Sequence, residues 1–147
     1  MNSKRSLRRA MGAFFLLILL CSLDAQQLKG LKFRGVDIPY TLKHEDTVIE
    51  KGKYELEVVM PQTASLRVFY LKINKDKDAL CILSGTKLHY KTEKVSELHR
   101  DPNIPKQPRL TMRRNTEEKK LYIYFESGKR APDYPFERIR FEIDYIE

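Results

Sequence analysis

Apolar and polar residues alternate along several short stretches of this sequence, and this pattern favours β-strands. Between Ile139 and Tyr145 every second residue is apolar, and the residues between them are charged. The stretch 120–126 repeats the pattern. Successive side chains of a strand point to opposite faces, so a period of two indicates a strand with one buried face. No stretch has a comparable helical pattern, and the predicted fold class is all-β.

The predicted strands follow one another at even spacing, separated by turn-forming residues. We expect about eight or nine of them, and their spacing favours an antiparallel β-sandwich. The alternative is a small β-barrel. The stretch 66–74 is apolar on both faces, so we expect it to be a central strand. Ser84-Gly85 and Ser127-Gly128 are interpreted as hairpin turns.

The segment Thr47–Met60 is predicted to form a hairpin with its turn at Lys51–Lys53. Gly52 lies in the middle of that turn, where the backbone needs the freedom of glycine. The piece Val48–Leu56 resembles the apolar–x–x–Gly–x–Tyr–x–apolar hairpin of several small exported bacterial β-sandwich proteins of unassigned function. This resemblance assigns no functional residue.

Residues 1–25 have the layout of a secretory signal peptide. A basic segment from Lys4 to Arg9 precedes an apolar run from Met11 to Cys21, and Ser-Leu-Asp-Ala follows. We predict cleavage after Ala25. This leaves residues 26–147 as a single domain that is exported, either to the periplasm or out of the cell.

The apolar run is shorter than the roughly 20 residues that a membrane span needs. The alternative to cleavage is a domain tethered to the membrane through residues 10–21, either uncleaved or lipidated at Cys21. Leu20 argues against lipidation, because bacterial lipoprotein signals usually have a small residue before the lipidated cysteine. Membrane contact is expected through this segment alone.

The charge of the chain points away from nucleic acid. The sequence has 28 Lys and Arg against 20 Asp and Glu, a net charge of +8, and residues 26–147 carry +5 of it. An excess of this size favours solubility and weak attraction to anionic surfaces. Since no nucleic-acid-binding motif is present, we predict no nucleic-acid partner.

The sequence contains no pattern typical of a catalytic or metal site. Its histidines lie far apart and lack metal-ligand spacing, and no Gly-x-Ser-x-Gly motif occurs. These histidines are His44, His89 and His99. We therefore predict no catalytic residue, no metal and no cofactor. Cys81, within the apolar stretch 79–83, is predicted to be buried and unreactive.

The candidate binding residues are tyrosines and arginines near the C-terminus. Tyr122 and Tyr124 lie on the polar face of one predicted strand, and Arg138 and Arg140 lie on the polar face of the next. Tyr134 lies in the loop between them. If the two strands pair, these residues line one face, and Tyr and Arg are favoured at binding hot spots. In the alternative interpretation, another part of the chain covers this face and the tyrosines belong to the core.

These observations favour an exported binding or envelope-interaction module over an enzyme. Its partner would be a protein or a glycan of the cell envelope. Contact would involve the tyrosines and arginines or the loop Asp101–Arg109, which is rich in proline and lacks strand pattern. One alternative is a small secreted hydrolase or metal-dependent enzyme that uses the loop histidines, and another is an accessory subunit of an envelope complex.

Overall fold

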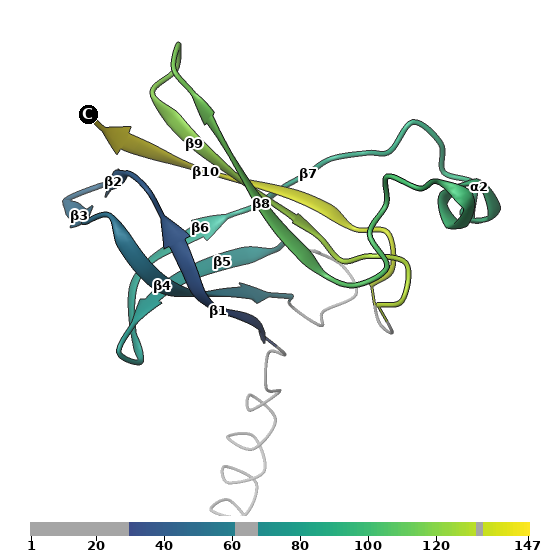
Figure 1. The fold of residues 1–147 in the computed structure, drawn as a ribbon, viewed down its shortest axis with the longest axis horizontal. Coiled ribbons are helices and arrows are strands. Elements are labelled where there is room, and N and C mark those ends of the chain that lie inside the picture. The colour runs from purple at the N-terminus through teal and green to yellow at the C-terminus, as the bar shows by residue number, and fades with distance from the viewer. Residues whose placement is uncertain (1–29, 61–67, 132–133) are drawn as a thin grey trace, which may run out of the picture.

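The chain folds into two antiparallel β-sheets (Figure 1). The computed structural model describes residues 30–60, 68–131 and 134–147. The predicted signal peptide lies outside these residues. Within them the chain forms ten strands and one short helix, which confirms the all-β prediction. No helix in these ranges is long and apolar enough to cross a membrane.

The strands are divided between the sheets in an order that differs from their order in the chain. The first, sheet A, has the order β1 (Gly30–Ile38), β4 (Gly52–Val59), β5 (Tyr70–Lys75) and β6 (Asp78–Ser84). The second, sheet B, has the order β3 (Thr47–Ile49), β2 (Thr41–His44), β10 (Arg138–Ile146), β9 (Lys120–Glu126) and β8 (Arg109–Asn115), and β7 (Thr86–Lys87) also pairs with β10. As predicted, β5 is central in its sheet; the part of that prediction that falls on 66–67 lies outside the described residues.

The chain crosses between the two sheets at three places. Pro39 and Tyr40 separate β1 from β2, and a proline without a backbone N–H is suited to such a bend. Glu50 and Lys51 separate β3 from β4, and Gly85 separates β6 from β7. A Cβ atom on Gly85 would lie 2.4 Å from Ile139 Cγ2, so this crossing has no room for a side chain.

Two of the predicted hairpins are therefore wrong. In the segment Thr47–Met60, β3 pairs with β2 and β4 pairs with β1 and β5, so the two strands belong to different sheets. Ile49 and Tyr54 both contribute to the core, and the crossing between them brings both into it. The Tyr54 hydroxyl donates a hydrogen bond to the carbonyl of Glu50 at 2.5 Å. This bond links a side chain of β4 to the backbone of the crossing segment. Ser84-Gly85 is likewise a crossing between sheets.

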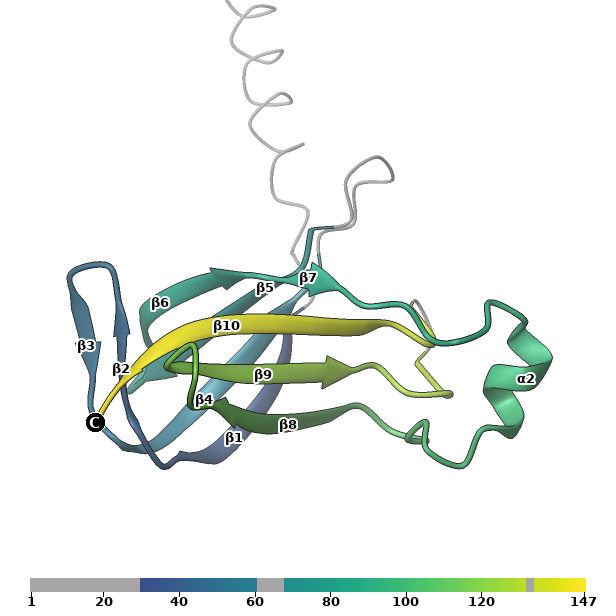
Figure 2. The ribbon, with the colours of Figure 1, turned by 90° about the horizontal axis from the view of Figure 1, so that it is seen from above.

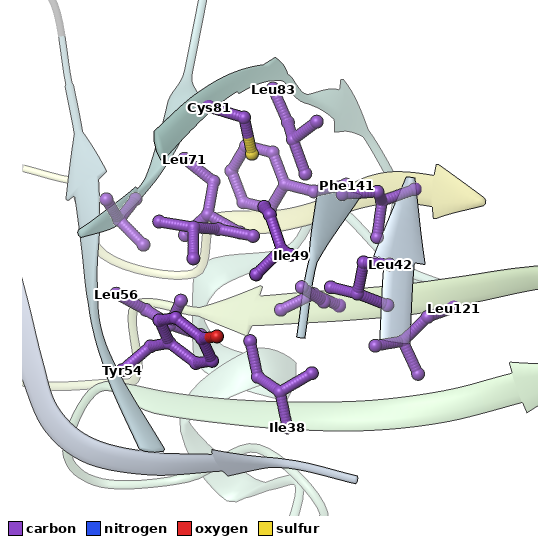
Figure 3. Close-up of a cluster of buried hydrophobic side chains, with 14 of the residues drawn as sticks. Ile38, Leu42, Ile49, Tyr54, Leu56, Leu71, Cys81, Leu83, Leu121 and Phe141 are labelled. Atoms are coloured by element: carbon purple, nitrogen blue, oxygen red, sulfur yellow. The ribbon is translucent and has the colours of Figure 1, made fainter. Parts of the chain in front are cut away.

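One apolar core lies between the sheets (Figure 3). Leu56, Leu71 and Leu83 of sheet A meet Leu121 and Phe141 of sheet B there. The inward residues of β9 and β10 are those that the alternation predicts: Leu121, Ile123, Phe125, Ile139, Phe141, Ile143 and Tyr145. Burial of these side chains supplies the main favourable free energy of the fold.

The segment between β7 and β8 differs from its prediction in one element. It contains a six-residue helix, α2 (Val95–Arg100), although no stretch of the sequence has a helical pattern that would predict one. Leu98 is the buried residue of this helix, and Ile104 is buried shortly after it. Such a short helix gives no amphipathic repeat that a sequence pattern would reveal.

Two isoleucines of β10 test the position of the core. Ile139 is fully buried and Ile146 is 44% exposed. We expect Ile139→Ala to lower the free energy of unfolding by about 2–5 kcal/mol, because it leaves a cavity. Ile146→Ala should change it by about 0.5 kcal/mol or less. Urea unfolding followed by circular dichroism measures both, and equal losses in the two variants would contradict this core.

Candidate functional site

The pairing of β9 with β10 brings the predicted tyrosines and arginines onto one face. Arg140 lies opposite Tyr124, and Arg138 lies opposite Glu126. On the other side of β9, Arg113 of β8 lies opposite Tyr122. We call this outward surface of sheet B the tyrosine–arginine face; it comprises Thr111, Arg113, Tyr122, Tyr124, Arg138, Arg140 and Glu142.

No other described element covers this face. Figure 2 looks onto β8, β9 and β10, and α2 lies beyond one end of these strands. Tyr122 and Tyr124 are partly exposed, whereas their neighbours Ile123 and Phe125 are buried in the core. The tyrosines therefore belong to the outer surface of the sheet.

The rings and guanidinium groups of this face pack against one another. The rings of Tyr122 and Tyr124 meet edge to face, with centroids 6.3 Å apart. The guanidinium carbon of Arg140 lies 4.9 Å from the Tyr122 ring centroid, and that of Arg138 lies 5.8 Å from the Tyr124 centroid. Cation–π contacts of this kind hold a ring and a cation in a defined orientation.

Hydrogen bonds fix one end of the face. The Tyr122 hydroxyl donates to the Glu118 carboxylate and accepts a hydrogen bond from Asn115 Nδ2 at 3.3 Å. The hydrogen bond to Glu118 raises the pKa of Tyr122. Glu142 accepts from Lys120 Nζ at 3.2 Å, and this bond raises the pKa of Lys120. Tyr122 is therefore held as a neutral ring within a network of charges.

The two arginines of β10 differ in their ion pairs. Arg140 Nη2 lies 2.6 Å from Glu142 Oε1, so its charge is balanced by a carboxylate. Arg138 makes no ion pair with any described residue, and its neighbour Glu126 pairs with Arg109 instead, at 2.6 Å. Arg138 is thus the cation of this pair that remains available to an anionic group.

The structure places Tyr134 away from the tyrosine–arginine face. Its ring contacts Phe69 edge to face, with centroids 6.2 Å apart. It lines a separate apolar cleft of about 310 Å³ together with Leu31, Met60 and Phe125. The nearby Phe136 packs on His99. The loop that carries Tyr134 turns away from the outer face of β9, and position in the sequence gave no indication of this.

The predicted proline-rich loop lies at the end of the face and is anchored there. Lys129 Nζ donates to the carbonyl oxygens of His99 at 2.8 Å and Asp101 at 2.5 Å. Gly128 has φ +86°, and a Cβ there would lie 2.9 Å from the carbonyl carbon of Gln107. Ser127-Gly128, predicted as a hairpin turn, begins the connection between the paired strands β9 and β10, and Gly128 also contacts the proline-rich loop closely. This contact joins residues far apart in the sequence.

The remaining candidates for chemistry are dispersed or buried. His89 and His99 are exposed, and His44 is partly exposed. In the part of the chain that the structure describes, no group of three or more His, Cys, Asp or Glu is placed to hold a metal ion. Cys81 is buried, as predicted, and burial raises the pKa of its thiol from 9.0 to about 11.

Sequence reasoning missed the contribution of β8 to the face. Arg109, Thr111 and Arg113 alternate with Leu110 and Met112, which pack against the core. This alternation was visible in the sequence, but the sequence did not show which strand lies beside β9.

The chain matches no protein-family model, no curated protein and no solved structure.

The raised pKa of Cys81 predicts slow reaction with thiol reagents. At pH 8 a thiol of pKa about 11 has roughly 100-fold less thiolate than one of pKa 9.0, and the thiolate is the reactive form. In a Cys21→Ser chain, where Cys81 is the single thiol, Ellman's reagent should therefore react at least about 100-fold faster after unfolding in urea. Comparable rates in the folded and unfolded states would show that Cys81 is accessible.

The outward position of the tyrosines predicts that both are dispensable for folding. We expect the double variant Tyr122→Ala and Tyr124→Ala to keep the circular dichroism spectrum of the wild type. It should lose only about 1–2 kcal/mol of unfolding free energy, from the ring contact and the cation–π contacts. Thermal unfolding measures this loss, and an unfolded double variant would place the tyrosines in the core.

Proposed function

We propose that this protein is an exported β-sandwich module that binds a protein or glycan partner through the tyrosine–arginine face. In this proposal residues 1–25 deliver the chain to the periplasm or out of the cell. The observation that carries the proposal is the arrangement of partly exposed tyrosine rings between arginines on an uncovered sheet face.

The rigidity of the face supports a binding role. Association usually costs conformational entropy when side chains become ordered at an interface. Here the tyrosine rings already contact each other and two guanidinium groups, and Tyr122 is held by Glu118 and Asn115. Part of the ordering cost is therefore met before a partner arrives, and tyrosine loses little freedom because it has few rotatable bonds.

The charges of the face favour a partner that carries acidic groups. Arg113, Arg138 and Arg140 lie on it together with Glu142, which is shared between Arg140 and Lys120, and the neighbouring Glu126 is paired with Arg109. Charge complementarity of this kind mainly accelerates encounter and fixes the orientation of the partner. The rings add apolar area that suits either sugar rings or an apolar side chain.

A comparison of two sheet faces tests the proposal. The full chain would be offered to a glycan array and to an envelope extract of its host, with the double variant Tyr122→Ala and Tyr124→Ala in parallel. Tyr70→Ala is the control, because Tyr70 is a partly exposed tyrosine of sheet A. We expect the double variant to bind its strongest partner at least about 10-fold more weakly than the wild type, whereas the control should bind normally.

Two outcomes would contradict the proposal. In the first, the double variant binds the partner as tightly as the wild type, and in the second, neither protein binds any glycan or envelope component. Equal losses in the double variant and in Tyr70→Ala would indicate a general loss of structure, and circular dichroism of both variants distinguishes that case.

A further inference from the structure

A polar groove of about 690 Å³ lies at one end of the tyrosine–arginine face. One wall is formed by the segment 89–104, which contains α2, and the other by outward residues of β8, β9 and β10. The residues that matter for its chemistry are Tyr90, Asp101, Asn103, Arg109, Glu126 and Arg138. Its volume is in the range of sites that hold small ligands.

The wall formed by the segment 89–104 is held in place by packing and by hydrogen bonds. Leu98 and Ile104 are buried beneath it. Lys129 binds the carbonyl oxygens of His99 and Asp101, as described above. Asp101 Oδ1 accepts hydrogen bonds from the backbone N–H and the side-chain amide of Asn103, at 2.8 and 3.1 Å. The groove is therefore formed before any ligand enters.

Glu126, one of the two acidic residues that line the groove, is already paired. Glu126 lies between Arg109 and Arg138 in the register of the sheet. It accepts hydrogen bonds from Arg109 Nη2 at 2.6 Å and from Arg109 Nε at 3.2 Å. Arg138 is left without a carboxylate partner in the described chain, and its Nε is buried without a hydrogen-bond partner there.

Tyr90 places a second unpartnered group in the same groove. Its hydroxyl oxygen is buried and has no hydrogen-bond partner among the described residues. Burial, together with the negative charge of Glu126, raises the pKa of Tyr90 to about 12. The hydroxyl is therefore protonated at neutral pH and can donate a hydrogen bond. Buried polar groups are nearly always hydrogen-bonded in folded proteins, so these two need an explanation.

We propose that the groove binds the carboxylate of an acidic saccharide, with the buried Tyr90 Oη and Arg138 Nε turning toward it to donate hydrogen bonds. Both groups are donors, so a ligand that satisfies them must be an acceptor, and charge makes a carboxylate the stronger one. This inference deepens the proposed function and rests on it, since it names the class of partner.

The rest of the groove favours a saccharide over an acidic peptide. Asp101, Asn103, Thr111 and Glu126 line it with both acceptors and donors. Sugar hydroxyls act as donor and acceptor at once, so they match such a lining. The Tyr124 ring, next to Arg138, offers an aromatic surface to a sugar ring that extends along the face.

Calorimetric titration of the full chain with trigalacturonate tests this inference. The fully methyl-esterified trisaccharide has the same shape without the charge, and we expect it to bind at least about 10-fold more weakly. Tyr90→Phe and Arg138→Gln should each weaken binding of the acid about 10-fold, because each removes one donor to a charged group. Tyr90→Phe removes an unpartnered hydroxyl alone, so its melting temperature should not fall.

Arg34→Gln is the matched control, since Arg34 is an exposed arginine of sheet A and lies outside the groove. The affinity of this variant should stay within about twofold of the wild type, because an exposed charge away from the site contributes little to affinity.

Three results would overturn the inference: no binding of trigalacturonate, equal binding of the ester, or unchanged binding by Tyr90→Phe. Binding of oligoglutamate in preference to trigalacturonate would overturn the saccharide class. The proposed function is tested by a separate experiment, the double variant of Tyr122 and Tyr124. Tyr122 and Tyr124 lie outside the groove lining, so loss of partner binding in their double variant would stand even if Tyr90→Phe had no effect.

Discussion

Strands β9 and β10 are hydrogen-bonded along almost their whole length, with Arg138 opposite Glu126 at one end and Asp144 opposite Lys120 at the other. Because side chains of paired strands alternate between the two faces, this register places one set of residues in the core and the other on the outer surface. A shift of β9 by one residue would bury its tyrosines and expose Phe125. The burial of the core side chains therefore also determines which tyrosines and arginines meet on the outer face.

The sequence predicted the features that depend on residues close together in the chain, and it did not predict those that depend on contacts between distant segments. The alternation in 120–126 and 139–145 is local, and it correctly predicted both strands and their buried sides. The segment Thr47–Met60 shows the limit, because a turn pattern does not reveal that the chain crosses to the other sheet. In the same way, the anchoring of the proline-rich loop by Lys129 and the distance of Tyr134 from the face depend on contacts between segments distant in the sequence.

The two outer surfaces of the fold differ in how their charges are balanced. On sheet A, Glu55 pairs with both Lys32 at 3.1 Å and Arg34 at 3.2 Å, and these contacts lower the pKa of Glu55. On sheet B, Glu142 balances Arg140, while Arg138 has no ion pair with a described residue and the Tyr90 hydroxyl in the adjoining groove has no hydrogen-bond partner among them. Two buried donor atoms without a hydrogen-bond partner among the described residues, Tyr90 Oη and Arg138 Nε, therefore belong to residues that line one groove at the end of the tyrosine–arginine face. This pair supports the proposal that sheet B binds a partner.

The most direct measurement of this assignment is an NMR titration of the full, ¹⁵N-labelled chain with trigalacturonate, in which every backbone amide reports its own environment. We expect chemical-shift changes in the segment 89–104, in β9 around Tyr124 and in β10 around Arg138. Amides on the outer face of sheet A, such as that of Lys72, should keep their positions. Changes centred on Lys32 and Lys72 would contradict the account, since they would place ligand binding on the opposite sheet.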